Sequence, residues 1–196
     1  METKNIMIVG VGGQGTLLTS RVLGGVILDS GYDVKLSEVH GMAQRGGSVT
    51  TFVRYGKKVY EPIVEAGFAD ILIAFERLEA LRYSHYLKSD GIMIVNDARI
   101  DPMPVVIGKE EYPDGIYDKL SEKYKLIVVD ALNEAKKLGN VRVFNIIVLG
   151  ALSGFMDLDI DIWKEVIRKT VPQKTIDINL EAFEVGRSLS KESIYD

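Results

Sequence analysis

The chain has 196 residues, of which 46% are hydrophobic, and a formal net charge of −4. This length and composition predict one domain, residues 1–196, with a sizeable core. A net negative chain lacks the basic face that a nucleic-acid backbone requires, so nucleic acid is not an expected partner. The absence of cysteine excludes disulfides, a cysteine nucleophile and any iron–sulfur cluster held by this chain alone.

The sequence predicts neither a membrane segment nor a metal site. Its longest apolar run, residues 143–156, is interrupted by two polar residues and two glycines, and no signal-like segment opens the chain. With only two histidines, a histidine-rich metal site cannot form. We therefore expect a cytoplasmic protein that binds neither a membrane nor a metal ion.

Short apolar runs alternate with helical patterns along the chain. We predict strands at residues 5–9, 33–39, 70–75, 91–96 and 125–129. Between the first two, apolar side chains recur at helical spacing, Gly24 and Gly25 indicate close packing, and Gly31 is placed to end the helix. This alternation predicts an α/β fold with a Rossmann-like, mostly parallel sheet and flanking helices.

Two stretches interrupt this pattern. Residues 48–55 alternate like a strand, and a turn at residues 56–58 directs the chain toward residues 59–60, which predicts an inserted β-hairpin. Prolines mark an irregular connection around a short strand at residues 105–107. A helix is predicted at residues 79–87, and the carboxyl end is predicted to be helical at residues 131–138, 143–155, 162–170 and 175–189.

A glycine-rich segment, Gly10-Val11-Gly12-Gly13-Gln14-Gly15, follows the first strand and opens the first helix. It matches the dinucleotide fingerprint G-x-G-x-x-G, in which amides at a helix N-terminus face an anion. It also resembles a phosphate loop without its lysine, so nucleoside triphosphate hydrolysis is not expected. The alternative is a turn needed only for packing, with hydrated amides. The predicted cofactor-binding residues are Gly10, Gly12, Gly13, Gln14, Gly15 and Thr16.

A second glycine-rich segment, residues 37–48, follows the second strand and is expected at the same carboxyl edge of the sheet. Within it, Glu38 and His40 are candidates for proton transfer, and Arg45 is suited to clamp a phosphate or carboxylate. The alternatives are that Glu38 pairs with Arg45 or a neighbour, and that His40 is a hydrogen-bonded structural residue.

The two segments together resemble the gamma-type component of the 2-oxoacid:ferredoxin oxidoreductases. Within the second segment, the sequence Glu38-Val39-His40-Gly41-Met42-Ala43-Gln44-Arg45-Gly46-Gly47 looks more like the indolepyruvate type than the pyruvate or 2-oxoglutarate types. The likeness in element order covers nearly the full chain. The resemblance implies oxidative decarboxylation of an aryl 2-oxoacid to an acyl-coenzyme A, with electrons passed to ferredoxin. Thiamine diphosphate and iron–sulfur clusters are then expected on a larger partner subunit, in a hetero-oligomer that meets ferredoxin.

The implied role of this chain is to close over the partner's active site and help bind coenzyme A. Catalytic roles fall to Glu38, His40 and Arg45, and Met42 is expected to shape an aryl pocket. The chain alone should be inactive, and homodimer formation in isolation stays open. Two other readings remain, a self-sufficient dinucleotide-dependent oxidoreductase and a non-catalytic scaffold subunit. The implied active-site loop and interface residues are Gly41, Met42, Ala43, Gln44, Gly46, Gly47 and Ser48.

Overall fold

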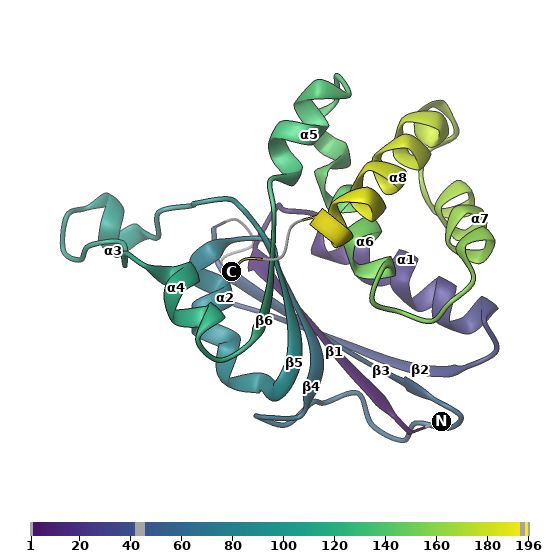
Figure 1. Ribbon diagram of the computed structural model, residues 1–196, viewed down its shortest axis with the longest axis horizontal. Helices are drawn as coiled ribbons and strands as arrows, with labels where there is room; N and C mark the ends of the chain where they lie inside the picture. The colour runs from purple at the N-terminus through teal and green to yellow at the C-terminus, as the bar shows by residue number, and fades with distance from the viewer. Residues whose placement is uncertain (1, 42–45, 193–194, 196) are drawn as a thin grey trace.

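A twisted six-stranded sheet forms the centre of the molecule (Figure 1). The computed structural model describes residues 2–41, 46–192 and 195. Along the sheet the order is β2-β3-β1-β4-β5-β6, with bounds β1 (Lys4–Val11), β2 (Asp33–His40), β3 (Ser48–Gly56), β4 (Ala69–Ala74), β5 (Leu87–Asn96) and β6 (Lys125–Val129). β3 is antiparallel to both neighbours, and β1, β4, β5 and β6 pair in parallel. The predicted mostly parallel sheet is therefore confirmed.

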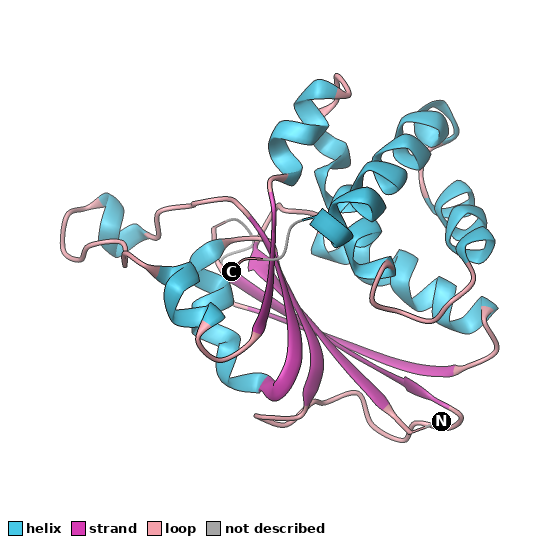
Figure 2. Cartoon of the chain, in the orientation of Figure 1, coloured by secondary structure: helices cyan, strands magenta, loops and turns pink. Residues whose placement is uncertain are grey.

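Helices cover the sheet in two layers (Figure 2). One layer contains α1 (Thr16–Asp29), α5 (Ala131–Lys137), α6 (Phe144–Ser153), α7 (Ile160–Thr170) and α8 (Ile176–Glu192), and the other contains α2 (Arg77–Tyr83) and α4 (Ile116–Ser121). Alternate side chains of a strand point to opposite faces. Accordingly, Ile6 and Ile8 belong to one buried cluster, whereas Met7 and Val9 belong to the other.

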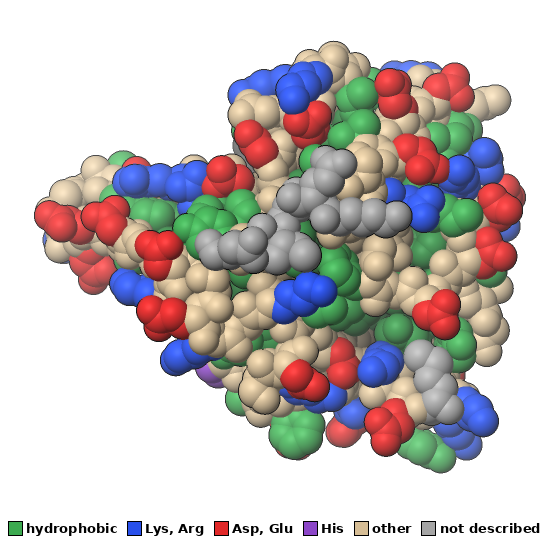
Figure 3. Space-filling view, viewed as in Figure 1, with side chains coloured by type: hydrophobic (Ala, Val, Ile, Leu, Met, Phe, Trp, Pro, Cys, Tyr) green, Lys and Arg blue, Asp and Glu red, His purple; other side chains and the backbone are tan. Residues whose placement is uncertain are grey.

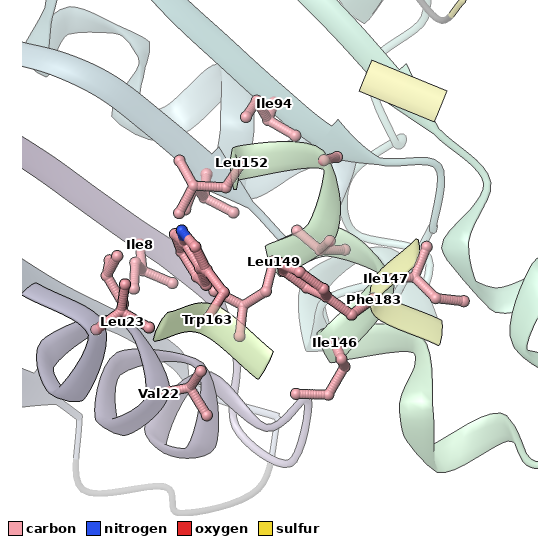
Figure 4. Packing of buried hydrophobic residues seen from close by; sticks show 14 of the residues in the cluster. Ile8, Val22, Leu23, Ile94, Ile146, Ile147, Leu149, Leu152, Trp163 and Phe183 are labelled. Atoms are coloured by element: carbon pink, nitrogen blue, oxygen red, sulfur yellow. The ribbon is translucent and has the colours of Figure 1, made fainter. Parts of the chain in front are cut away.

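The thicker layer packs around Trp163, which is fully buried (Figure 4). Its indole ring stacks on Phe183 with 5.6 Å between ring centroids. Gly150 of α6 and Gly186 of α8 allow the two helices to touch along their backbones, because a Cβ on Gly186 would overlap the carbonyl of Ile147. This rigid layer supports α1, whose first residues carry the glycine-rich turn.

The features predicted for α1 are confirmed. The amide of Gly31 donates to the carbonyl of Leu28, and its φ of +83° is one that glycine adopts without strain. A Cβ on Gly24 would lie 2.8 Å from Cδ1 of Leu36, and one on Gly25 would lie 2.8 Å from Cγ1 of Val166. Both glycines therefore mark close packing.

Three predictions of local structure are wrong. Residues 57–68 form no strand, so the predicted hairpin with residues 59–60 does not exist; β3 pairs with β1 and β2 instead. Its side chains are largely buried on both faces, and its backbone pairs with a strand on each edge, as expected for an interior strand of a sheet covered by helices. Residues Met103–Val106 form the short helix α3 in place of a strand, and the helix predicted to reach residue 87 ends at Tyr83. Leu87 already belongs to β5, where it pairs with Ala69 of β4, and its side chain is buried in the second cluster.

The described surface has mixed charge. In the space-filling view, Lys and Arg side chains are interspersed with Asp and Glu over the visible face (Figure 3). Among the helices of the described ranges, none has the length and apolar character needed to cross a bilayer.

Candidate functional site

The first glycine-rich segment forms the turn from β1 into α1, at the carboxyl edge of the sheet. Gly13 and Gly15 have φ values of +104° and +84°, a region that glycine occupies without strain. Gly15 is the N-cap of α1 and provides no side-chain cap, and the first helical turn contains no acidic residue. The amides of a first helical turn have no intrahelical acceptor, and the helix dipole makes this end positive. The turn can therefore receive an anion.

Gln14 is the residue of this turn that faces the protein interior. Its Oε1 accepts a 2.7 Å hydrogen bond from the Val11 amide, and its Nε2 donates a 2.8 Å bond to the Phe75 carbonyl. Gly10 leaves room for this side chain, since a Cβ there would lie 3.0 Å from the Gln14 Oε1. These contacts hold the turn against the end of β4. Direct contact between Gln14 and a cofactor stays a prediction.

The two glycine-rich segments meet, as expected for loops at the same sheet edge. The Gly12 amide donates a 2.8 Å hydrogen bond to the Gly47 carbonyl. Between the segments lies a cavity of about 460 Å³, which we call the carboxyl-edge cavity. It is lined by Gly12, Gly13, Gly15, Thr16, Leu17, Glu38, His40 and Val49.

Glu38 and His40 lie on the α1-facing side of β2, because side chains two residues apart share a face. His40 Nδ1 is 3.8 Å from Glu38 Oε1, and Thr51 Oγ1 donates a 3.4 Å hydrogen bond to Glu38 Oε2. The His40 side chain is 55% exposed and that of Glu38 28%. Glu38 thus has a neighbouring partner, and both side chains remain open to a ligand.

Several predicted site residues cannot be placed in this cavity. Met42, Ala43, Gln44 and Arg45 lie outside the described residues. On either side of that segment, Gly41 ends the approach from β2, and Gly46 has a φ of +77°.

The end of the second segment is attached to α2 by the buried carboxylate of Glu79. No sequence motif indicated this residue. Ser48 Oγ donates a 2.5 Å hydrogen bond to Glu79 Oε2 and accepts one of 3.0 Å from the Tyr83 hydroxyl. Arg82 donates to the other oxygen of Glu79 at 2.7 Å. Burial raises the pKa of Glu79, while Ser48 and Arg82 act against this shift. These contacts position Ser48, the first residue after the loop.

The carboxyl-edge cavity fits a phosphate group at the glycine turn. A Cβ on Gly13 would meet no atom within 4 Å, so a ligand can approach that backbone closely. Among the described lining residues, Glu38 and His40 are the titratable ones, and none is Lys or Arg. Here the attraction for an anion comes from the start of α1. Beside it, Asn145 of α6 packs against Gly15, with a buried Oδ1 that has no hydrogen-bond partner among the described residues.

A Rossmann-like sheet whose glycine turn meets a second glycine-rich loop is compatible with a domain that binds the phosphate group of a cofactor or cosubstrate. The pyruvate ferredoxin/flavodoxin oxidoreductase family is matched over residues 5–189, and the chain belongs to this family. The resemblance inferred from the two segments is thereby confirmed.

Two relatives are similar to the chain in sequence, and one solved structure is similar to it in fold. It is 44% identical over 201 residues to indolepyruvate oxidoreductase subunit IorB of Thermococcus kodakarensis, which covers 99% of both chains. It is 29% identical over 192 residues to 2-oxoglutarate synthase subunit KorC of Methanothermobacter marburgensis, which covers 96% of this chain and 97% of the relative. The fold is similar to that of 2-oxoglutarate:ferredoxin oxidoreductase from Magnetococcus marinus, with a TM-score of 0.77 and 22% identity. That match covers all of this chain and 32% of the longer one, and that structure has 2-oxoglutarate, coenzyme A and succinyl-CoA bound.

Proposed function

We propose that this chain is a subunit of an indolepyruvate:ferredoxin oxidoreductase and forms a single domain over residues 1–196. The complex would convert an aryl 2-oxoacid anion and coenzyme A into an acyl-coenzyme A, carbon dioxide and a proton, with two electrons passed to ferredoxin. The observation that carries this proposal is the identity of 44% to an IorB subunit over 99% of both chains, against 29% to a KorC subunit. Because ferredoxin is the acceptor, we place the reaction in the cytoplasm.

The proposal assigns the redox cofactors to a larger partner subunit. Iron–sulfur clusters are held by cysteine thiolates, and this chain contains no cysteine. Thiamine diphosphate, which stabilises a carbanion when bound, is assigned to the same partner. This chain alone is then inactive, and ferredoxin meets the complex.

The role of this chain is to bind coenzyme A and to complete the wall of the partner's active site. The amides at the start of α1 receive a phosphate of coenzyme A, with Arg45 as its cationic partner. Glu38 and His40 face the same cavity, so they contact or orient the bound thiol ester and exclude water. Ser48, held by Glu79, fixes one end of the loop to which Met42 belongs, and we assign to Met42 the shaping of the aryl pocket.

The strand order disfavours a self-sufficient dinucleotide enzyme. In the dinucleotide fingerprint, the acid that binds the ribose ends the strand beside the glycine turn. Here β3 lies between β1 and β2, so Glu38 ends a strand two positions away. Neighbouring strands lie about 4.8 Å apart, so Glu38 lies about one strand spacing farther from the glycine turn than the acid of the fingerprint does.

The test is anaerobic, coenzyme A-dependent reduction of a viologen dye with indolepyruvate. The rate is compared among this chain alone, the larger partner subunit alone and the reconstituted pair. Activity in the pair alone is expected. Turnover by the larger subunit alone would make this chain a scaffold, and dinucleotide-dependent turnover by this chain alone would support the dinucleotide enzyme.

Within the pair, Arg45→Ala separates binding from scaffolding. We expect the KM for coenzyme A to rise about tenfold or more, because a charge-assisted bond to phosphate is lost. An exposed cation elsewhere, Lys174, provides the control Lys174→Ala. An unchanged KM in Arg45→Ala would favour the scaffold reading.

A further inference from the structure

A second cavity lies at the opposite, amino edge of the sheet, where β1 and β4 begin. It has a volume of about 380 Å³, within the range of small-molecule sites. We call it the amino-edge cavity. Lys4 of β1 lines it, whereas the carboxyl-edge cavity begins just beyond the other end of that strand. At about 3.3 Å per strand residue, the two cavities are roughly 25 Å apart.

The floor of the amino-edge cavity is apolar and its walls are aromatic. Ile6, Ile71 and Ile92 contribute the floor from three neighbouring parallel strands. Tyr32 and Tyr55 stand on one side, with ring centroids 6.0 Å apart in an edge-to-face arrangement, and Phe155 lies in the connection after α6. A flat apolar group fits such a space better than a sugar or an inorganic ion does.

Tyr55 gives an independent sign of a ligand. The residue is only 6% exposed, yet its hydroxyl has no hydrogen-bond partner among the described residues. The hydroxyl is not fully enclosed, and Tyr55 lines the cavity, so a molecule in the cavity can be the partner of this hydroxyl. Burial and the charge of Asp70 raise the pKa of Tyr55 to about 12, which keeps the hydroxyl a donor. Buried tyrosine hydroxyls usually have a partner, and here a ligand can supply it.

The rim carries charges of both signs. Asp70 is already satisfied, since it accepts from Lys88 at 2.7 Å and from the Asn5 amide at 2.7 Å. Lys4 is more loosely placed, at 3.8 Å from Asp70. Asp90 and Asp157 have no hydrogen bond or ion pair with another described residue through their side chains. The rim therefore offers one available cation and two available carboxylates.

These features define a complementary ligand. We propose that the amino-edge cavity is a binding site for an aromatic α-amino acid, with its ring on the isoleucine floor, its carboxylate at Lys4 and the Tyr55 hydroxyl, and its ammonium at Asp90 and Asp157. A metal ion is not a competing occupant, because no group of three His, Asp or Glu within residues 2–41, 46–192 and 195 could hold one. The site is independent of the proposed function, since it involves no residue of the carboxyl-edge cavity.

The proposal is tested by titration calorimetry of the full chain with L-phenylalanine. Three analogues each lack one group that the site would recognise. Phenethylamine lacks the carboxylate, phenylpropionate lacks the ammonium, and L-alanine lacks the ring. We expect saturable binding of L-phenylalanine and binding at least about tenfold weaker for each analogue, as for loss of one charged or apolar anchor.

Variants of the cavity assign the site. Tyr55→Phe keeps the ring and removes the hydroxyl, and Asp90→Asn removes one carboxylate; each is expected to weaken L-phenylalanine binding about fivefold to tenfold. His40→Ala and Asp114→Asn, at other places in the fold, should leave binding unchanged. Thermal melts without ligand check that Tyr55→Phe is folded.

The outcomes separate clearly. Absence of saturable binding at millimolar L-phenylalanine overturns the proposal. Binding of phenethylamine as tight as that of L-phenylalanine also overturns it, because the site would then bind a simple cation. Full affinity for L-phenylalanine in both Tyr55→Phe and Asp90→Asn overturns it as well. Loss of binding in His40→Ala would move the ligand to the carboxyl-edge cavity and also overturn it.

Discussion

The backbone amide of Gly12 donates a 2.8 Å hydrogen bond to the carbonyl oxygen of Gly47, which joins the two glycine-rich segments. This bond occupies the amide of Gly12, so that amide does not face a ligand. The anion-binding capacity of the turn therefore falls to Gly13, Gly15 and the first residues of α1. The first prediction depends on this assignment.

Gly13→Ala should weaken coenzyme A binding by the reconstituted complex. The new Cβ meets no atom within 4 Å, but alanine is strained at a φ of +104° and should reshape the turn. We expect stability to fall by about 1 kcal/mol or more and the KM for coenzyme A to rise several-fold. Both are measured on the same preparation, by urea unfolding and by viologen reduction.

Gly31→Ala is the matched control. Gly31 also has a positive φ, +83°, and equally free space, but it lies at the other end of α1. It should lose similar stability with an unchanged KM. If both variants change the KM equally, the glycine turn has no special role in binding.

Gln14→Met should destabilise the chain by about 2 kcal/mol, because the Val11 amide loses its side-chain partner in a buried place and the Phe75 carbonyl keeps only the 3.2 Å bond from Asn96. Methionine has a similar volume, so the packing of the turn is largely kept. Urea unfolding measures the effect, and the exposed Gln173→Met provides the control. Equal stability of the two variants would show that the side chain of Gln14 does not hold the turn.

Glu79→Gln should change how stability depends on pH. Burial raises the folded-state pKa of Glu79 above its ordinary value of 4.5, so between pH 4.5 and the raised pKa the folded state holds a proton that the unfolded state releases. Stability from this group is greatest below pH 4.5 and falls as the pH rises through the raised value. The stability of the unsubstituted chain relative to Glu79→Gln should therefore decrease from pH 4.5 upward.

Unfolding curves at several pH values measure this trend. Glu110→Gln, at an exposed position, should show no such trend relative to the unsubstituted chain. A relative stability of Glu79→Gln that stays constant with pH would contradict the raised pKa.

Gly186→Ala should destabilise far more than Gly24→Ala. A Cβ on Gly186 would overlap backbone atoms of α6, which cannot move without separating two helices, and we expect a loss of about 3 kcal/mol or more. On Gly24 the obstacle is the end of the flexible, 43% exposed Leu36 side chain, and alanine gains about 1 kcal/mol of helix propensity. Thermal melts distinguish the two. Comparable losses would mean that the α6–α8 contact is not rigid.

The sequence was informative where a residue type has a local cause. Gly31 ends α1 because the backbone needs a positive φ there, and the two glycine-rich segments share an edge because they follow strands that run the same way. The position of β3 could not be predicted, since its alternating pattern shows that it is a strand but not which strands lie beside it. The role of Glu79 in holding Ser48 could not be predicted either, because it also depends on the strand order. Its partner Ser48 is distant in the chain, and only the strand order brings α2 to it.

The placement of β3 has a consequence for how this domain can diverge. Ser48 is in register with Val11, and His40 with Val49, so both arms of the β2–β3 hairpin are fixed at the sheet edge. Strand pairing that does not involve residues 41–47 thus sets the positions of both strands, and a connection between fixed strands is where changes of sequence are tolerated best. The frame that presents this connection to the carboxyl-edge cavity is therefore built by residues outside the connection.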